Sequence, residues 1–186
     1  MNAEEIPYII VFNLIYTPFK SLRITRDLSQ YRTVAEPREC RRVRNKLPDH
    51  KNRMISVAML AHEDEDQLPA TLEQAQKVAD ELIVVDSYSE DATAEIAADY
   101  DAEVYQTEWM GYADTWQYAF DQASGDWILQ LGSDEVLSDG AIDRIQEIDE
   151  QGGEYKGYKI YSINYFLNRK VSHWTRYAPR LFKSGY

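Results

Sequence analysis

The stretch Asp126-Trp-Ile-Leu-Gln-Leu-Gly-Ser-Asp-Glu-Val-Leu-Ser138 decides the fold class of this chain. Its apolar part, residues 127–131, is short and follows turn residues, which predicts a buried strand. Asp134 and Glu135 come at the carboxyl end of that strand, where ligands of open α/β sheets bind. A carboxylate there can hold a hard divalent cation, which in turn neutralises a diphosphate. The alternative interpretation is that both acids are solvated residues at the start of the next helix.

The sequence around this stretch alternates between strand and helix patterns. Apolar runs predict strands at 55–60, 82–85, 103–106 and 127–131, and helical spacing predicts helices at 68–79, 90–100, 111–123 and 138–149. Such alternation predicts an α/β fold with a mainly parallel, Rossmann-like sheet covered by helices on both faces. The aromatic, basic stretches 155–166 and 177–182 predict additional antiparallel strands beside this sheet.

Acidic residues recur at the ends of the predicted strands. Glu63 follows the first strand, Asp86 closes the second and Asp134 follows the fourth. Because adjacent strand ends of a parallel sheet meet in one crevice, we expect these three residues to lie close together. Asp86 can accept hydrogen bonds from a base or ribose, and Asp134 can ligate Mg²⁺ or Mn²⁺. Each acid taken alone is more often a helix cap or a surface residue.

Charge is distributed unevenly along the chain. Residues 1–53 hold 11 basic and 6 acidic residues, residues 54–154 hold 2 and 26, and residues 155–186 hold 7 and none. The acidic middle block repels nucleic acid and anionic lipid, so neither is expected as a partner of that block. The basic flanks can contact a phosphate or a membrane surface locally, or they can pair with the acidic block. The single cysteine, Cys40, excludes an internal disulfide and a thiolate metal cluster.

The amino-terminal part has no regular pattern. Its most apolar stretch, residues 6–19, is too short and too interrupted by proline for a spanning helix, and Glu4 and Glu5 precede it. We therefore predict neither a secretion signal nor a membrane anchor, and a cytoplasmic protein with at most peripheral contact at the inner face of the membrane. We predict that residues 1–53 form an extension of low order or peripheral position, and that residues 54–186 fold without it.

Several motifs in this order resemble those of the family 2 glycosyltransferases. They are Ile55 to Leu60 with Glu63, then Glu81-Leu-Ile-Val-Val-Asp-Ser-Tyr-Ser-Glu-Asp-Ala-Thr93, then Trp109-Met-Gly-Tyr112, then Ala123-Ser-Gly-Asp-Trp-Ile-Leu-Gln-Leu-Gly-Ser-Asp-Glu135. The resemblance covers about residues 54–183 and is strongest to the lipopolysaccharide core glucosyltransferase-like branch. It implies a GT-A fold, a nucleotide-diphosphate sugar donor, a divalent cation (Mg²⁺ or Mn²⁺), and transfer with inversion to a glycan or glycolipid acceptor.

The resemblance also implies roles for individual residues. Asp86 would contact the uracil or the ribose, and Asp134 would be the metal-contacting acid of an Asp-x-Asp motif. The implied nucleotide-sugar site as a whole consists of Ala61, His62, Glu63, Asp86, Ser87, Ser133 and Asp134. The domain would then comprise a nucleotide-sugar half at 54–150 and a partial acceptor-side region at 151–186.

The chain departs from the family pattern in three places. Gly132 stands where the family has the first acid of Asp-x-Asp, and Thr115-Trp-Gln117 stands where it tends to show Gln, a basic residue and Asn. Family members continue past the match at Arg180-Leu-Phe182 into a segment with a carboxylate base, whereas this sequence stops at Tyr186. An inverting transfer needs a base, and His173 is a candidate only by residue type. The catalytic residue therefore stays unknown, and we expect poor turnover by the chain as given.

Two other interpretations stay open. The chain can be a non-catalytic remnant or fragment that keeps the nucleotide-binding fold without turnover. It can also be a nucleotide-binding regulatory domain of another lineage, an interpretation that depends on fold analogy alone.

Overall fold

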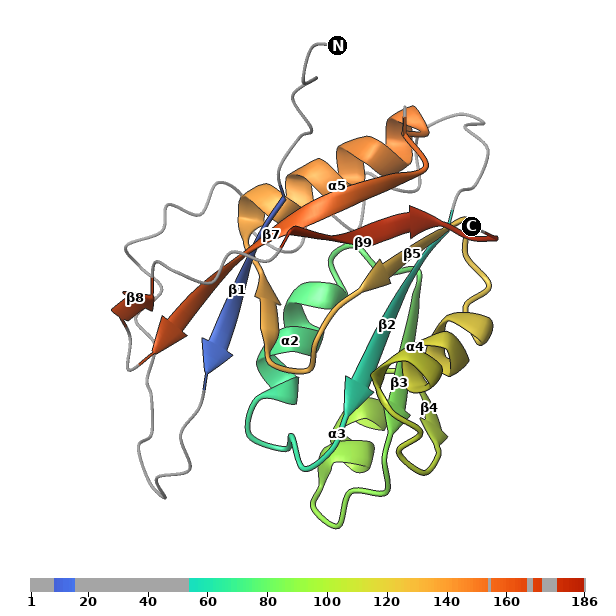
Figure 1. Ribbon diagram of the computed structural model, residues 1–186, viewed down its shortest axis with the longest axis vertical. Coiled ribbons are helices and arrows are strands. Elements are labelled where there is room, and N and C mark those ends of the chain that lie inside the picture. Colours follow the sequence, from blue (N-terminus) through green and yellow to red (C-terminus); the bar gives the residue numbers. More distant parts are fainter. Residues whose placement is uncertain (1–8, 16–53, 154, 167–168, 172–176, 186) are drawn as a thin grey trace. The chain divides into compact units, whose positions relative to one another are not determined.

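The computed structural model describes residues 9–15, 54–153, 155–166, 169–171 and 177–185. Within these residues the strands form one mixed sheet in the order β4-β3-β2-β5-β9-β7-β1-β6, with β8 paired to β7 (Figure 1). The strands are β1 (Ile9–Ile15), β2 (Ile55–Ala61), β3 (Glu81–Asp86), β4 (Glu103–Gln106), β5 (Trp127–Gln130), β6 (Glu135–Leu137), β7 (Gly157–Phe166), β8 (Arg169–Val171) and β9 (Tyr177–Lys183). The helices are α2 (Leu68–Ala75), α3 (Thr93–Asp99), α4 (Tyr112–Asp121) and α5 (Asp139–Gln151).

The first half of the sheet is parallel and the second half is largely antiparallel. Strands β4, β3, β2 and β5 pair in parallel, and β9 then runs antiparallel to both β5 and β7. The register places Ala61 beside Asp86 and Asp86 beside Gln106, so the carboxyl ends of β2, β3 and β4 are aligned. The predicted α/β fold class, with a parallel core and antiparallel strands near the carboxyl end, is confirmed.

Helices cover both faces of the parallel strands. Alternate residues of each strand enter different clusters: Val57 and Met59 pack with apolar residues of α2, α3 and α5, whereas Ala58 packs with Ile83 and with Ala119 of α4. Because both faces are buried, the strands read as nearly continuous apolar runs. This burial explains why residues 55–60 and 82–85 predicted strands so clearly.

The starts of α5 and α3 differ in whether a serine side chain caps the helix. The hydroxyl oxygen of Ser138 accepts a hydrogen bond from the backbone N–H of Ala141 at 3.2 Å, so Ser138 caps α5. Ser89 precedes the predicted helix 90–100 and is also a residue type that often caps a helix, but α3 starts only at Thr93 and the Ser89 hydroxyl donates to Asp86. Among the helices of the described residues, none is both long and apolar enough to cross a membrane.

The amino-terminal strand is the main difference from the predicted domain limits. Strand β1 lies within the sheet, parallel to β7 through all seven of its residues and antiparallel to β6 at Val11 to Asn13. The prediction that the whole of residues 1–53 is peripheral therefore does not hold for Ile9–Ile15. Residues 1–8 and 16–53, including Cys40, lie outside the described residues, and the remaining domain limits stay predictions.

The carboxyl-terminal region shares the sheet with the nucleotide-sugar half. Strand β9 inserts between β5 and β7, and the short strand β6, which the sequence did not predict, returns along β1. The regions 54–150 and 151–186 are consequently linked by main-chain pairing from Trp127 to Leu129 with Leu181 to Lys183. This pairing brings residues of β9 beside the end of β5.

We expect removal of residues 1–53 to destabilise the domain, because it takes β1 from between β7 and β6 and leaves two strand edges unpaired. A chain that starts at Met54 should melt about 10 °C or more below the full chain, or aggregate. Thermal unfolding followed by circular dichroism tests this, with a chain starting at Ile6 as the control that keeps β1. Equal melting temperatures for the full chain and the Met54 chain would show that the boundary predicted from the sequence is the right one.

Candidate functional site

The residues at the centre of the candidate site form a tight turn between β5 and β6. In this acidic turn (residues 132–135), the backbone N–H of Glu135 donates to the carbonyl oxygen of Gly132 at 3.0 Å. The backbone N–H of Gly132 in turn donates to Oε2 of Glu135 at 2.8 Å. The side chain of Glu135 thus folds back to the first residue of the turn and closes it with a second hydrogen bond.

Two other elements hold the acidic turn in place. The hydroxyl of Thr71, a fully buried residue of α2, donates to the carbonyl oxygen of Ser133 at 2.8 Å. Arg180 of β9 forms an ion pair with Glu135, with 2.5 Å between Nη1 and Oε2. The Glu135 side chain is only 5 % exposed and that of Arg180 18 %, so this pair is shielded from solvent. The turn is therefore fixed by a helix, by the antiparallel strand β9 and by its own side chain.

Asp134 projects from this turn into an electrostatically unfavourable environment. Burial, together with the negative charges of Glu135 and Asp64, raises the pKa of Asp134 from its ordinary value of 3.8 to about 6. A hydrogen bond to its own backbone N–H and the positive charge of Arg180 act in the opposite direction without cancelling the rise. Ionised Asp134 is therefore a carboxylate whose charge is only partly compensated by the protein.

The space above Gly132 is occupied by its neighbours. A Cβ atom added to Gly132 would lie 2.9 Å from Oδ1 of Asp134 and 3.2 Å from Cγ of Glu135. Because Gly132 has no side chain, the carboxyl group of Asp134 can lie over its backbone. The absence of a Cβ at Gly132 thus leaves room for the carboxyl group of Asp134 in this position.

The loops that follow β2 and β3 are joined to each other by hydrogen bonds. The backbone N–H of Ser87 donates to the carbonyl oxygen of Ala61 at 3.0 Å, and that of Glu63 donates to the hydroxyl oxygen of Ser89 at 3.0 Å. The backbone N–H of Glu90 donates to Oε1 of Glu63 at 2.7 Å. Glu63 has a φ of +57°, so the loop turns sharply at this exposed residue. These bonds make the two loops one rigid wall of the site.

Asp86 is fully buried beneath this wall. Its carboxylate accepts hydrogen bonds from the backbone N–H and the hydroxyl of Ser89 and, at 3.1 Å, from Nε2 of Gln106. Both carboxylate oxygens therefore have partners within the protein, and Asp86 connects the ends of β3 and β4. A direct contact between Asp86 and a nucleotide would require one of these bonds to be exchanged.

The structure brings the predicted site residues to one edge of the sheet. Ala61 ends β2 and is followed by His62 and Glu63, Asp86 ends β3 and is followed by Ser87, and Ser133 and Asp134 come after β5. Three residues near the turn were not predicted from the sequence: Asp64, whose charge acts on Asp134, and Thr71 and Arg180, which position the turn. Asp64 lies in the polar stretch after β2, where it looks like an ordinary helix-start acid, and its backbone carbonyl does accept from the N–H of Leu68 at 2.9 Å.

The donor set of the acidic turn fits a hard divalent cation. Asp134 supplies carboxylate oxygens, whereas Glu135 is already engaged by Arg180. Asp64 adds negative charge to the surroundings of Asp134, but its two carboxylate oxygens accept hydrogen bonds from the backbone N–H of His62 and from Nε2 of Gln67. Among the residues that the structure describes, no three His, Cys, Asp or Glu side chains gather into a complete metal cage. Mg²⁺ is commonly bound by one or two carboxylates together with substrate phosphates and water, so such a partial set is what a phosphate-binding site needs.

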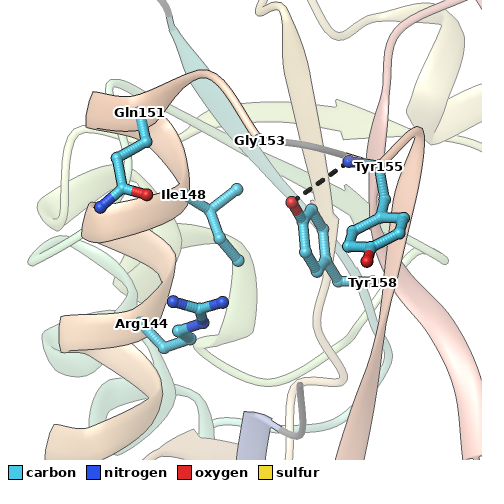
Figure 2. Close-up of a pocket in the computed structure, with 6 residues that line it drawn as sticks. All are labelled: Arg144, Ile148, Gln151, Gly153, Tyr155 and Tyr158. Atoms are coloured by element: carbon cyan, nitrogen blue, oxygen red, sulfur yellow. Dashed lines mark hydrogen bonds between the residues drawn. The ribbon is translucent and has the colours of Figure 1, made fainter. Parts of the chain in front are cut away.

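A separate cavity of about 240 Å³ lies between the end of α5 and the start of β7 (Figure 2). It is lined by Arg144, Ile148, Gln151, Gly153, Tyr155 and Tyr158. Figure 2 shows Tyr158 opposite Ile148 of α5, with Tyr155 on the other side of the Tyr158 ring. Gly153 adjoins Trp127 at the amino end of β5, because a Cβ added to this glycine would lie 2.6 Å from Cζ2 of Trp127. The cavity is therefore remote from the acidic turn, which follows the carboxyl end of β5.

In comparisons with known proteins, a family model described as glycosyl transferase family 2 matches residues 56–185. An uncharacterised glycosyltransferase of Rickettsia bellii is 30% identical over 130 residues, which are 69% of this chain and 42% of the relative. The lipopolysaccharide core biosynthesis glycosyltransferase LpsC of Rhizobium meliloti is 27% identical over 118 residues, 61% of this chain and 43% of LpsC.

Among solved structures, glucosyl-3-phosphoglycerate synthase from Mycobacterium tuberculosis, in complex with Mn²⁺, UDP and glucosyl-3-phosphoglycerate, has a TM-score of 0.40 and 26% identity. That similarity covers 44% of this chain and 34% of the synthase. The chain thus spans about two fifths of the length of the curated relatives named above and a third of the synthase.

We expect Arg180→Met to destabilise the domain by about 2–4 kcal/mol, because it leaves the buried carboxylate of Glu135 without its cation. Urea unfolding of the variant and the parent chain measures this loss. Arg144→Met is the matched control: Arg144 pairs with the exposed Glu147 on α5, and removal of such a surface pair should not change the midpoint measurably. An Arg180→Met midpoint as close to the parent as that of Arg144→Met would contradict the role given to the buried pair.

The raised pKa of Asp134 predicts a stability effect with a defined sign. Between about pH 4 and pH 6 the folded state holds this proton more firmly than the unfolded state, so its contribution to stability falls as the pH rises through 6. Without ligand, Asp134→Asn should therefore be more stable than the parent by about 1–2 kcal/mol at pH 7.5 and by much less at pH 4. Denaturant unfolding at both pH values tests this, with Asp143→Asn on the exposed face of α5 as the control. A difference that does not depend on pH would contradict the electrostatic explanation.

Proposed function

This chain belongs to glycosyl transferase family 2, and we propose that it binds a nucleotide-diphosphate sugar and transfers the sugar, with inversion, to a glycan or glycolipid acceptor. The observation that carries the proposal is the acidic turn. It holds Asp134 as a partly uncompensated carboxylate at the carboxyl edge of the parallel strands, close to Asp64. That is the edge at which open α/β sheets bind nucleotides.

The donor would lie across the aligned strand ends. We assign the base and ribose to the wall formed by Ala61, His62 and Glu63 with Asp86 and Ser87. His62 and Glu63 are exposed on this wall, and Ser87 is half-buried, so all three are accessible to a ligand. The diphosphate would then lie over Ser133 and Asp134.

The proposed cofactor is a divalent cation, Mg²⁺ or Mn²⁺, held by Asp134. The strongly acidic surroundings would otherwise repel the diphosphate, and the cation supplies the charge that neutralises the leaving diphosphate. Asp134 fits this role because its ionised form gains most from an added positive charge. The negative charge of Asp64 acts in the same direction, while its carboxylate oxygens are held by His62 and Gln67.

The remaining residues of the turn position Asp134. Glu135, Thr71 and Arg180 fix the backbone on both sides of Asp134. Because the turn is already fixed, less conformational entropy is lost when a diphosphate binds to it. The acceptor hydroxyl still needs a base; the candidate His173 lies outside the described residues, so no base is assigned.

A second function is favoured by one observation. Gly132 replaces an acid, and both oxygens of Asp86 are engaged within the protein, which reduces the number of groups that can contact the ribose. A domain that binds a nucleotide and does not turn it over would tolerate both features. Hydrolysis of a panel of nucleotide-diphosphate sugars, including UDP-glucose, in the presence of Mn²⁺ distinguishes the two functions. Release of free sugar above the rate without protein supports transfer chemistry.

We expect UDP to bind this chain in the presence of Mn²⁺ or Mg²⁺ and far more weakly in chelator. Asp134→Ala should reduce the affinity measured with the metal by about tenfold or more, equivalent to about 1.4 kcal/mol. Isothermal titration calorimetry with UDP, with and without MnCl₂, measures both effects, and Asp143→Ala is the control for loss of an acid from the same region. Equal affinity with metal and in chelator, or in the parent and Asp134→Ala, would exclude this metal assignment.

A further inference from the structure

Exposed apolar side chains gather at the edge of the sheet that holds the candidate site. Within the described part of the chain, the large apolar residues that are exposed are Tyr88, Trp109, Met110, Tyr112 and Tyr155. The first four, with exposed fractions of 55%, 51%, 45% and 75%, come from only two loops, and we call them the aromatic rim. An exposed apolar group of this kind marks an interaction surface more often than a single exposed residue does.

The two loops of the aromatic rim leave neighbouring strands at paired positions. Asp86 at the end of β3 is in register with Gln106 at the end of β4, and Nε2 of Gln106 donates to its carboxylate at 3.1 Å. The backbone N–H of Thr107 donates to the carbonyl oxygen of Asp86 at 3.1 Å. Tyr88 comes two residues after Asp86 and Trp109 comes three after Gln106. The rim is thus continuous with the wall to which the base and ribose are assigned.

The second loop is held in a defined conformation although its side chains are exposed. The backbone N–H of Met110 donates to the hydroxyl oxygen of Thr115 at 3.3 Å, and Thr115 itself is fully buried in α4. Its backbone N–H donates to the carbonyl oxygen of Gly111 at 3.0 Å, and the φ of +94° at Gly111 favours glycine. The rings of Trp109 and Tyr112 meet edge to face, with centroids 4.8 Å apart. Thr115, one of the departures from the family pattern, thus positions two exposed rings.

The charge around the rim restricts what it can bind. Glu90, Glu108 and Asp114 flank the aromatic residues and are exposed, and residues 54–154 contain only 2 basic residues against 26 acidic ones. Anionic lipid and nucleic acid are repelled by such a surface. A neutral saccharide matches it, because its C–H faces pack on aromatic rings and its hydroxyl groups donate to carboxylates, which act only as acceptors.

We propose that the aromatic rim, chiefly Trp109 and Tyr112, is a binding site for a neutral saccharide and presents the acceptor glycan to the donor site. The assignment of the saccharide as acceptor rests on the proposed function. It gives the nucleotide-sugar half a role in acceptor binding, through residues that lie beside the donor wall. The saccharide site itself follows from the exposed rings, their fixed loop and the surrounding carboxylates.

The test uses the full chain and a panel of soluble neutral trisaccharides, maltotriose, mannotriose and triacetylchitotriose, observed by saturation-transfer NMR and titration. At least one should bind, and Trp109→Ala and Tyr112→Ala should each weaken that binding by about tenfold, the equivalent of one lost ring contact. Tyr155→Ala removes an exposed tyrosine outside the rim and should leave binding unchanged. All three variants should bind UDP with Mn²⁺ as the parent does, which shows that they are folded.

The same measurements separate failure of this proposal from failure of the proposed function. Absence of binding to every trisaccharide, or equal weakening by Tyr155→Ala and Trp109→Ala, overturns the saccharide site even when UDP binds. Stronger binding to phosphatidylglycerol vesicles than to phosphatidylcholine vesicles overturns it in favour of a membrane surface. Trisaccharide binding that depends on Trp109, in a chain that does not bind UDP, supports the saccharide site and overturns the proposed function instead.

Discussion

The buried carboxylate of Glu135 is the interaction on which the arrangement of the site depends. A single oxygen of this side chain accepts from the backbone N–H of Gly132 and from Arg180, so it closes the acidic turn and ties it to β9. Removal of either donor would leave a desolvated charge, which is far more costly than the loss of a surface ion pair. The turn therefore has one well-defined geometry. It holds Asp134 where burial and neighbouring negative charges disfavour the ionised carboxylate.

In the neighbouring loops, too, buried or loop-bridging carboxylates have hydrogen-bond partners within the protein. Glu63 and Glu65 each accept a backbone N–H from the opposite loop, at Glu90 and Ala92, while their own backbone N–H groups donate to Ser89 and Asp91. These reciprocal bonds use carboxylates as caps for backbone donors that strands and helices cannot satisfy. Several carboxylates of the acidic middle block (residues 54–154) thus stabilise the loops, and only the others are available for ligand binding.

Asp134 is an acid for which this compensation is incomplete. The raised pKa of Asp134 means that its ionised form costs stability in the absence of a cation. Sites that bind ligands often carry such a cost, because groups placed for a ligand are rarely those that best stabilise the empty fold. A divalent cation bound with a diphosphate would make the charge of Asp134 favourable for binding. At the same edge of the sheet, the aromatic rim adds a surface suited to an uncharged ligand.

The sequence by itself determined the parallel strands and the position of Asp134 at a strand end, because a strand buried on both faces must be an apolar run and its end must be polar. It could not show that Arg180, 45 residues further along the chain, neutralises Glu135, since pairing between distant strands leaves no periodic trace in the sequence. It also could not show that β1 enters the sheet or that the carboxylate of Asp86 accepts a hydrogen bond from Ser89. Only the tertiary structure decides which acids are compensated, because compensation depends on what the fold places beside each one.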